Sequence, residues 1–389
     1  MREVYLDYSA TTPVKKIVLD EMLPYFTEKF GNPSSLYRIG SESKDAIGLA
    51  RHRVAELIGA NEREIYFTSS GTEADNWAVI CASKARLNKG NHIITSAIEH
   101  HAILHTCEYL EKNGFDVTYL GVDQEGRISL SELEDAITEQ TTLISIMFAN
   151  NEVGSIQPVK EIARIAKEHG ILFHTDAVQA LGNMQIDVKE LGIDMMSISA
   201  HKIYGPKGIG ALYIRKGLMI PNLIHGGAQE NNKRAGTENL TGIVGFGKAA
   251  EIARIELASH IKQVTDCRDY FISELFSRID GLEINGGMAS RLPGNANLVF
   301  QGVEGEALLL YMDVRGICAS TGSACSSATF AASHVLQALG HPLERVYCSI
   351  RFTIGDFTTK EDIDYAVEEI VMIVEKLRAF SPLYIKKGS

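Results

Sequence analysis

The chain has 389 residues, of which 45% are hydrophobic and 22% are charged, as is typical of a folded globular protein. This length favours two domains, and 34 glycines against 9 prolines favour tight turns over a disordered linker. The 38 basic and 49 acidic residues give a net charge of −11, which argues against nucleic acid as a partner. No apolar run has the length of a signal peptide or a membrane span, so we expect a cytoplasmic protein with no membrane partner.

Short apolar runs alternate with longer amphipathic stretches between about residues 65 and 199. We predict strands at 65–67, 92–95, 143–149, 171–173 and 195–199, and helices at 72–86, 100–113 and 158–169. This alternation predicts an α/β fold with a mostly parallel sheet covered by helices on both faces. In such sheets ligands bind at the carboxyl ends of the strands. We place this large domain at 13–258.

The pattern of predicted strands and helices changes after about residue 258. We predict helices at 259–279 and 306–314, strands at 295–300 and 348–353, and a last helix that begins after Thr359. Asp362 follows Thr359 by three residues, which resembles a capping box. These elements predict a smaller α+β domain, to which we assign residues 1–12 and 259–389.

The first candidate site is the segment Thr68-Ser69-Ser70-Gly71-Thr72-Glu73-Ala74, between a predicted strand and a predicted helix. Small residues with backbone N–H groups at a helix N-terminus suit one phosphate group. The segment matches neither the P-loop pattern nor the dinucleotide pattern GxGxxG. Taken alone, an ordinary Ser/Thr helix cap is the better interpretation.

Two further candidates stand at strand ends. Asp176 could bind a metal, orient a histidine, hold a protonated ring nitrogen or simply cap a helix. Lys202, beside Ser199 and His201, is a candidate Schiff-base nucleophile, although most lysines are solvated surface charges. A phosphate cradle, a carboxylate for a pyridinium nitrogen and a Schiff-base lysine, in this chain order, are the groups that hold pyridoxal phosphate.

Longer motifs carry a resemblance that spans nearly the whole chain. They are Tyr5-Leu6-Asp7-Tyr8-Ser9-Ala10-Thr11-Thr12-Pro13, Gly31-Asn32-Pro33-Ser34-Ser35, Glu99-His100, Asn150-Asn151-Glu152, Ser199-Ala200-His201-Lys202, Arg234-Ala235-Gly236-Thr237-Glu238-Asn239, Gly322-Ser323-Ala324-Cys325-Ser326-Ser327 and Ser349-Ile350-Arg351-Phe352. With these motifs the chain resembles the cysteine desulfurases of the NifS/IscS type, which are class-V pyridoxal-phosphate enzymes of aminotransferase fold type I.

The resemblance implies a role for each site residue. The cofactor-binding residues that it implies are Gly71, Thr72, Asp176, Gln179, Ser199, His201, Lys202 and Thr237. Lys202 would form the Schiff base with pyridoxal 5'-phosphate, Asp176 would hold the pyridine nitrogen and Gln179 the phenolic oxygen. Thr237 would reach the phosphate of the neighbouring subunit, which implies a homodimer with shared active sites. His100 would stack on the cofactor ring and move protons, and Asn151 and Arg351 would hold the substrate.

Cys325 would accept the sulfur atom. It stands in 320–329, ten residues with small or hydroxyl side chains that cannot anchor a core, so we expect an exposed loop there. Cys81 and Cys107 fall in helix-like stretches, and Cys318 and Cys348 in strand-like runs, so we expect these four to be structural; Cys267 has no informative context.

We expect no metal site. His101 and His105 stand four residues apart on a predicted helix and could share a face. They lack the glutamate of the HExxH pattern, and no third ligand suggests itself.

The activity that the resemblance implies converts L-cysteine to L-alanine and leaves a persulfide on Cys325. A sulfur-acceptor protein would take it onward, either an iron–sulfur scaffold or a tRNA-thiolation protein. The alternatives are a selenocysteine lyase or an aminotransferase on the same fold, and a catalytically weak sulfur-assembly scaffold protein. The sequence departs from the family pattern at Tyr37, where histidine is common, and at Ala331-Ala332, where Glu-Pro is common.

Overall fold

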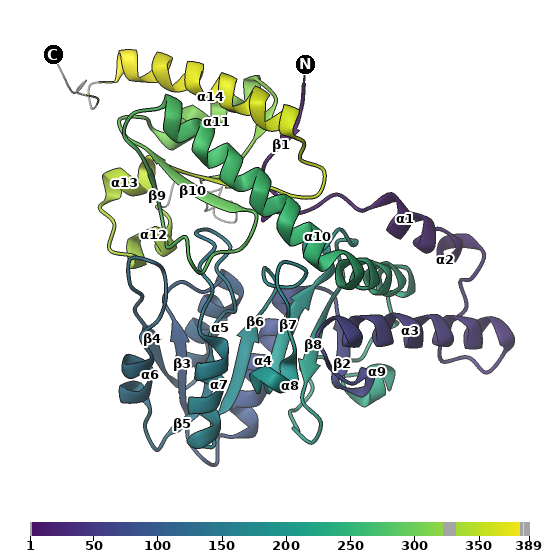
Figure 1. Ribbon diagram of the computed structural model, residues 1–389. Coiled ribbons are helices and arrows are strands. Elements are labelled where there is room, and N and C mark those ends of the chain that lie inside the picture. Colours follow the sequence, from purple (N-terminus) through teal and green to yellow (C-terminus); the bar gives the residue numbers. More distant parts are fainter. Residues whose placement is uncertain (1, 322–331, 382–383, 385–389) are drawn as a thin grey trace.

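The computed structural model describes residues 2–321, 332–381 and 384. A seven-stranded sheet lies at the centre of the larger unit, in the order β2-β8-β7-β6-β5-β3-β4 (Figure 1). Its strands are β2 (Ile65–Thr68), β3 (His92–Ser96), β4 (Asp116–Leu120), β5 (Thr141–Ser145), β6 (Leu172–Asp176), β7 (Met195–Ser199) and β8 (Gly210–Ile214). Strands β3 to β7 are parallel, whereas β8 runs antiparallel to both of its neighbours. The predicted mostly parallel α/β sheet is therefore confirmed.

Successive side chains of each central strand enter different cores, as the two-residue period of a strand requires. Ile94, Ile144 and Phe173 join the core beneath α3, α7 and α10, whereas Ile93 and Leu143 join the core beneath α4 and α5. Helices thus cover both faces of the sheet. The helices of this unit are α1 (Lys16–Met22), α2 (Pro24–Thr27), α3 (Arg38–Leu57), α4 (Gly71–Ala85), α5 (His101–Glu111), α6 (Leu130–Ala136), α7 (Val159–Glu168), α8 (Val188–Leu191) and α9 (Gln229–Asn232), with 3₁₀ turns at Glu62–Glu64 and Ala200–Lys202.

The long helix α10 (Leu240–Arg278) has 39 residues and connects the two units (Figure 1). Its first part packs closely on α3 and α1. A Cβ atom at Gly247 would lie 2.5 Å from the Cα of Ala50, and one at Gly245 would lie 2.5 Å from the sulfur of Met22. The glycines are therefore required by close helix packing. The helix begins before the predicted 259 and passes through residue 258, the boundary that the sequence predicts between the two domains.

The smaller unit contains a three-stranded antiparallel sheet in the order β12-β10-β9. Its strands are β9 (Leu282–Ile284), β10 (Asn295–Phe300) and β12 (Ser349–Thr353), and its remaining helices are α11 (Gly305–Val314), α12 (His334–Ala338), α13 (Leu343–Tyr347) and α14 (Lys360–Phe380). A separate strand pair joins β1 (Val4–Tyr5) in parallel to β11 (Ile317–Cys318). Val4 and Leu6 accordingly share a hydrophobic core with residues of α10, β10, β12 and α14.

Several predicted elements shift at their ends. The strand predicted at 143–149 forms as β5 and ends at Ser145, and the strand predicted at 171–173 extends to Asp176 as β6. The capping box is confirmed, because the side chains of Thr359 and Asp362 cap each other's backbone N–H groups. In the described part of the chain, no helix has the length and apolarity to cross a membrane.

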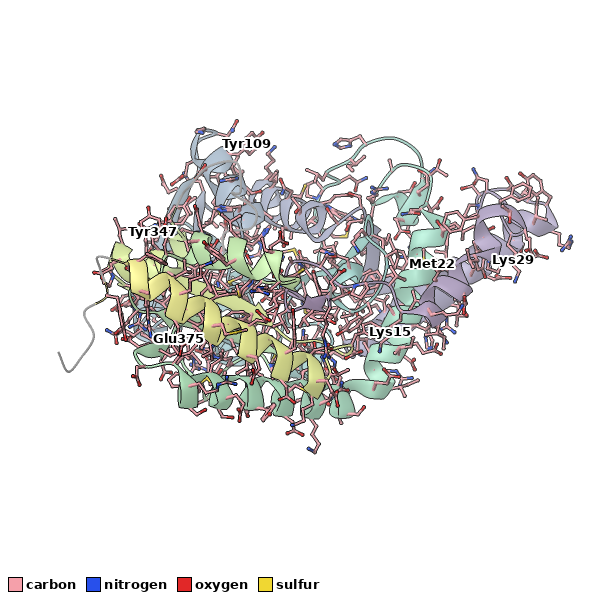
Figure 2. The ribbon with its side chains drawn as sticks, turned by 90° about the horizontal axis from the view of Figure 1, so that it is seen from above. Lys15, Met22, Lys29, Tyr109, Tyr347 and Glu375 are labelled. Carbon is pink, nitrogen blue, oxygen red and sulfur yellow. The ribbon has the colours of Figure 1, made fainter. Side chains whose placement is uncertain are left out.

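Helices α1 and α2 project from the body of the molecule. Figure 2 shows Lys29 at the outer end of this projection, far from Glu375 on α14. Large apolar side chains of the projection are exposed, including Phe26, Phe30 and Leu36. An exposed apolar surface of this kind marks an interaction site.

Candidate active site

A cleft of about 400 Å³ opens at the carboxyl ends of β6 and β7. The residues predicted for the site that line it are Gly71, Thr72, His100, Asn151, Asp176, Gln179, Ser199, His201, Lys202 and Arg351. The fold therefore brings these residues together from segments far apart in the chain. Thr237 does not line the cleft and is exposed. Cys325 and Ala331 lie outside the described residues.

Lys202 ends the 3₁₀ turn that follows β7. Its Nζ donates hydrogen bonds to the backbone oxygens of Ser9 at 2.5 Å and Ala10 at 2.7 Å. Gln179 Nε2 donates to the same Ser9 oxygen at 3.0 Å. The N-terminal segment thus forms one wall of the cleft and holds the lysine amine.

Asp176 is the last residue of β6 and is almost fully buried. Its Oδ1 accepts a hydrogen bond from the backbone N–H of Val178 at 2.9 Å. Burial raises the pKa of this carboxyl to about 6, while the Val178 hydrogen bond and the charge of Lys202 oppose the rise. The carboxylate is therefore the main form at neutral pH, and a cation that entered the cleft would stabilise it further.

The N-terminus of α4 forms the candidate phosphate cradle. Ser70 caps this helix by accepting a hydrogen bond from the backbone N–H of Glu73 at 3.1 Å. A Cβ atom at Gly71 would lie 2.7 Å from a methyl group of Val178, so only glycine fits without displacement. His201 contributes an imidazole whose Nδ1 contacts the hydroxyl of Thr11 at 3.1 Å, and burial lowers its pKa to about 4.

His100 caps α5 from the edge of the cleft. Its Nδ1 accepts a hydrogen bond from the backbone N–H of Ala102 at 3.1 Å. Burial, assisted by the charge of Lys202, lowers the pKa of His100 to about 4. The ring is therefore neutral at physiological pH, and because Nδ1 is an acceptor, its proton resides on Nε2.

Arg351 lies on β12 of the smaller unit and is almost fully buried. Its guanidinium donates from Nη2 to Asp7 Oδ1 at 2.7 Å and from Nη1 to the backbone oxygen of Asn151 at 3.2 Å. Its buried Nε has no partner among the described residues. A guanidinium with an unsatisfied buried donor is suited to a planar carboxylate.

Burial raises the pKa of each described cysteine thiol. The values reach about 11 for Cys81 and about 12 for Cys107, and the pKa values of Cys267, Cys318 and Cys348 also rise. None of these described thiols lines the cleft. They are poor nucleophiles at neutral pH because the thiol, rather than the thiolate, prevails.

Three imidazoles gather beside the cleft. The ring of His101 lies 4.8 Å from that of His105 and 4.7 Å from that of His334, measured between centroids. Within residues 2–321 and 332–381, however, no group of three His, Cys, Asp or Glu side chains is arranged to hold a metal ion.

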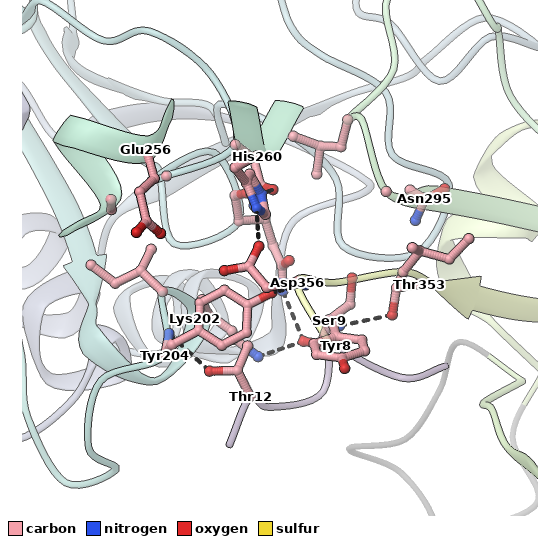
Figure 3. Close-up of a pocket in the computed structure, with 18 of the residues that line it drawn as sticks. Tyr8, Ser9, Thr12, Lys202, Tyr204, Glu256, His260, Asn295, Thr353 and Asp356 are labelled. Atoms are coloured by element: carbon pink, nitrogen blue, oxygen red, sulfur yellow. Dashed lines mark hydrogen bonds and ion pairs between the residues drawn. The ribbon is translucent and has the colours of Figure 1, made fainter. Parts of the chain in front are cut away.

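A smaller cavity lies on another side of Lys202, where the two units meet (Figure 3). Asp356, just after β12, is paired with Lys15 at 2.7 Å and with His260 of α10. Its backbone N–H donates to the Tyr204 hydroxyl at 2.7 Å. Tyr204 has a φ of 62°, which is strained for an aromatic residue. The pairing of Asp356 therefore fixes the smaller unit beside the turn that carries Lys202.

The donor set fits pyridoxal phosphate. The α4 N-terminus supplies backbone N–H groups with a glycine where a Cβ would clash, and the cleft also holds a buried carboxylate and a lysine amine. These groups suit a phosphate, a protonated ring nitrogen and an aldehyde respectively. The residues present therefore fit this cofactor.

Sequence reasoning assigned no function to three residues of the site. Asp7 pairs with Arg351, the Ser9 carbonyl receives Lys202, and Asp75 of α4 lines the floor of the cleft. The first two belong to a motif that was noticed only for its resemblance. Asp75 follows Gly71 by four residues, so its helical spacing places it on the same face of α4.

Comparisons with known proteins agree with this geometry. The aminotransferase class-V family matches residues 4–366. A cysteine desulfurase IscS from Dictyoglomus turgidum is 55% identical over 98% of this chain and 97% of its own length. The cysteine desulfurase IscS of Methanosarcina thermophila is 55% identical over 99% of this chain and 95% of its own.

Solved structures agree as well. A NifS-like protein superposes with a TM-score of 0.91 at 39% identity, over 96% of this chain and 100% of its own. The structure of SspA in complex with cysteine gives a TM-score of 0.81 at 37% identity, over 92% of this chain and 100% of its own. The alternatives of selenocysteine lyase, aminotransferase and inactive scaffold are not favoured by these similarities. The chain therefore belongs to the class-V aminotransferase family and, within it, to the pyridoxal-phosphate-dependent cysteine desulfurases of the NifS/IscS type.

Proposed function

We propose that the cleft at the ends of β6 and β7 converts L-cysteine to L-alanine and passes the sulfur atom to Cys325. The observation that carries this proposal is the convergence of Lys202, Asp176, His100 and Arg351 on one cleft. These residues come from two strand ends, a helix cap and the smaller unit, so the fold joins cofactor groups to a substrate clamp.

Each part of the cofactor has its own residues. Lys202 would attach it covalently, and Gly71, Thr72, Ser199 and His201 would bind its phosphate. Gln179 would hydrogen-bond its phenolic oxygen. Asp176 would keep a proton on its ring nitrogen through a charge-assisted hydrogen bond. When bound, pyridoxal phosphate supplies an electron sink for bonds broken at the substrate Cα.

The substrate would be held by its carboxylate. Arg351 would donate to the substrate carboxylate from its buried Nε. The backbone oxygen of Asn151 accepts a hydrogen bond from the same guanidinium, which would place Asn151 next to the substrate. The neutral ring of His100 presents its Nε2–H as a hydrogen-bond donor, so it would orient the substrate and the cofactor ring without adding charge to the cleft. Lys202, once displaced from the cofactor, would serve as the base.

The sulfur transfer requires a thiolate that can reach the substrate. The Cys325 sulfur would attack the substrate sulfur, forming an S–S bond as the substrate C–S bond breaks. The bonding electron pair passes to the carbon side, and a proton added there completes alanine. The other thiols of the described chain are buried or partly buried, have raised pKa values and lie away from the cleft, which supports this assignment to Cys325.

A homodimer would complete the site. Thr237 is exposed and away from the cleft of its own chain, which suits a contact with the phosphate of a neighbouring subunit. The exposed apolar side chains of α1, α2 and the following segment supply a surface that a second copy would cover. The sulfur acceptor would be a separate protein, such as an iron–sulfur scaffold. A reduced Cys325 suits the cytoplasm, which we propose as the compartment.

The test is to incubate the purified holoenzyme with L-cysteine and measure alanine, sulfide and protein-bound persulfide. We expect one alanine for each sulfur atom released, with sulfide appearing only when a reductant removes the persulfide. Formation of a keto acid in place of alanine, or turnover of selenocysteine without turnover of cysteine, would contradict the proposal.

A further inference from the structure

Two buried carboxyl groups near Asp176 have no role in the mechanism above. Asp75 of α4 is 1% exposed and lines the cleft, and Glu99 is 0% exposed and its charge acts on Asp75. Oδ1 of Asp75 and Oε2 of Glu99 have no hydrogen-bond partner among the described residues. A buried carboxylate without a partner is costly, so the protonation of these groups determines the charge of the site.

Asp75 faces neutral or acidic groups. Its Oδ1 lies 3.8 Å from Nε2 of His174 on β6, and its side chain hydrogen-bonds that of Ser197 on β7. Burial lowers the pKa of His174 to about 3, so this imidazole is uncharged and provides no counter-ion. The titratable groups that act on Asp75 are thus His174, Asp176 and Glu99, and the cleft further holds His100, His201 and Lys202.

Asp176 has better support for a negative charge than Asp75. It accepts the Val178 N–H and feels the charge of Lys202. Burial, followed by the charge of Asp176, raises the pKa of Asp75 well above its ordinary value, although the hydrogen bond with Ser197 opposes the rise. Burial also raises the pKa of Glu99 to about 8, although the Ser96 hydroxyl and the Met147 N–H donate to its Oε1. Neighbouring buried carboxyl groups of this kind do not all ionise.

Neighbouring hydroxyl and imidazole groups can accept the proton of a neutral Asp75. His174 Nε2 lies 2.9 Å from Ser197 Oγ, and its Nδ1 lies 2.9 Å from Ser145 Oγ. A neutral Asp75 can donate to Ser197, Ser197 to His174 Nε2, and His174 Nδ1–H to Ser145. If Asp75 were ionised, each of these hydrogen bonds would be reversed. Ser145 would donate to His174 Nδ1, His174 Nε2–H to Ser197, and Ser197 to Asp75.

We propose that Asp75 is a neutral carboxylic acid in the working enzyme and a positioning residue that leaves Asp176 as the single negative charge beneath the bound cofactor ring. This inference rests on the proposed pairing of Asp176 with the ring nitrogen. A neutral Asp75 adds no charge of its own, so Asp176 alone holds the ring-nitrogen proton. By donating to Ser197, the neutral Asp75 also fixes the tautomer of His174, whose Nε2 lies 2.9 Å from Ser197 Oγ and 3.8 Å from Asp75 Oδ1.

The test is infrared spectroscopy of the purified protein at neutral pH, with and without the cofactor. We expect the difference between the parent and Asp75→Asn to contain the carbonyl band of a protonated carboxylic acid in both states. Glu99→Gln is the matched control, since it should remove its own band and leave that of Asp75. Only carboxylate bands in the Asp75→Asn difference would overturn the inference.

Two further measurements keep the test decisive. If Asp75→Asn does not fold, Asp75→Glu replaces it in protein labelled with ¹³C-aspartate, and the variant should lack one ¹³C-shifted acid band that the parent has. Identical ¹³C-shifted acid bands in parent and variant would refute the inference. In folded holoenzyme, Asp75→Asn should leave the pH midpoint of the cofactor absorption unchanged. A fall of about one pH unit or more would mean that an ionised Asp75 had been stabilising the ring-nitrogen proton.

The failure of the proposed function would look different. If Asp176→Asn left the cofactor absorption and its pH midpoint unchanged, the pairing of Asp176 with the ring nitrogen would be wrong. The infrared band of Asp75 in cofactor-free protein does not depend on that pairing.

Discussion

Asp7 Oδ1 lies 2.7 Å from Nη2 of Arg351, so the N-terminal segment occupies one arm of the guanidinium that we assign to the substrate. Burial raises the pKa of Asp7 although Arg351 opposes the rise. The substrate carboxylate therefore meets a guanidinium that is already oriented and only partly neutralised. Its Nε, which has no partner among the described residues, is a donor available to the substrate.

Arg351→Lys should weaken substrate binding more than turnover. A lysine provides a point charge in place of the planar fork, so we expect KM for cysteine to rise about tenfold with a smaller change in kcat. Steady-state kinetics measure this. Arg345→Lys is the matched control, because Arg345 pairs with Glu283 away from the cleft. Equal effects of the two changes would contradict the assignment of Arg351.

Lys202→Ala should remove the visible absorption of the bound cofactor together with cysteine turnover, because no other described lysine lines the cleft. Spectroscopy and alanine release measure the two losses. Lys207→Ala is the control, since Lys207 stands five residues further along the chain and donates to the Thr12 oxygen outside the cleft. Parental turnover by Lys202→Ala would show that the assignment is wrong.

Asp176→Asn should raise the thermal stability of the cofactor-free protein but weaken the retention of the cofactor by the holoenzyme. Because burial raises the pKa of Asp176 to about 6, the native state without cofactor binds more protons than the unfolded state between the ordinary Asp pKa and that value. Its stability therefore falls as pH rises through this window.

The asparagine variant should accordingly melt at a higher temperature than the parent at neutral pH when both lack cofactor. It should also retain the cofactor less well. Thermal melting at several pH values measures the first effect, and the difference should vanish below the ordinary pKa of Asp. A lower melting temperature at neutral pH would contradict this account.

Cys325→Ser should bind cysteine but form neither alanine nor persulfide, because a hydroxyl stays protonated at neutral pH and is a poor nucleophile. Mass spectrometry after a single turnover should find the extra sulfur of the parent on the Cys325 peptide. Cys267→Ser, which changes a partly exposed thiol on α10, should behave like the parent. Sulfur found on Cys318 or Cys348 would defeat this mechanism.

Asp356→Ala should destabilise the protein by about 3 kcal/mol, because it leaves the largely buried Lys15 without its inner partner. Glu256→Ala removes the other, half-exposed partner of the same lysine and should cost less than about 1 kcal/mol. Denaturant unfolding measures both. The hydrogen bonds from His260 and Lys15 lower the pKa of Asp356 against the effect of burial, so its contribution should be lost as pH falls through that lowered pKa.

The sequence predicted those features that depend on local pattern. Asp176 and Lys202 were found because each follows an apolar strand, and α14 was found because Thr359 and Asp362 cap it. The strand β8 was not predicted. Its antiparallel direction could not be predicted either, since an apolar run carries no sign of its direction. The start of α10 was missed because Gly245 and Gly247 disfavour a helix locally and are explained only by packing against α1 and α3.

The pairing of Asp7 with Arg351 at the proposed substrate site could not be derived from the spacing of residues in the sequence. Asp7 and Arg351 stand near opposite ends of the chain, and only the pairing of N-terminal residues with the smaller unit brings them together. The same is true of Asp75, whose importance depends on the two strands beneath α4. The division of the chain at residue 258 and the roles assigned to the site residues, Thr237 and Cys325 included, stay predictions.

The pairing of β1 with β11, and of Leu6 with Thr353, also governs how the chain can fold during synthesis. The N-terminal residues leave the ribosome first, yet their partners are made near the end. The seven-stranded sheet can condense while this segment waits, because its strands all lie between residues 65 and 214. The segment whose carbonyls receive Lys202 gains its contact with Thr353 only when the last strand arrives. The central sheet of the nascent protein can therefore fold well before the cleft is complete.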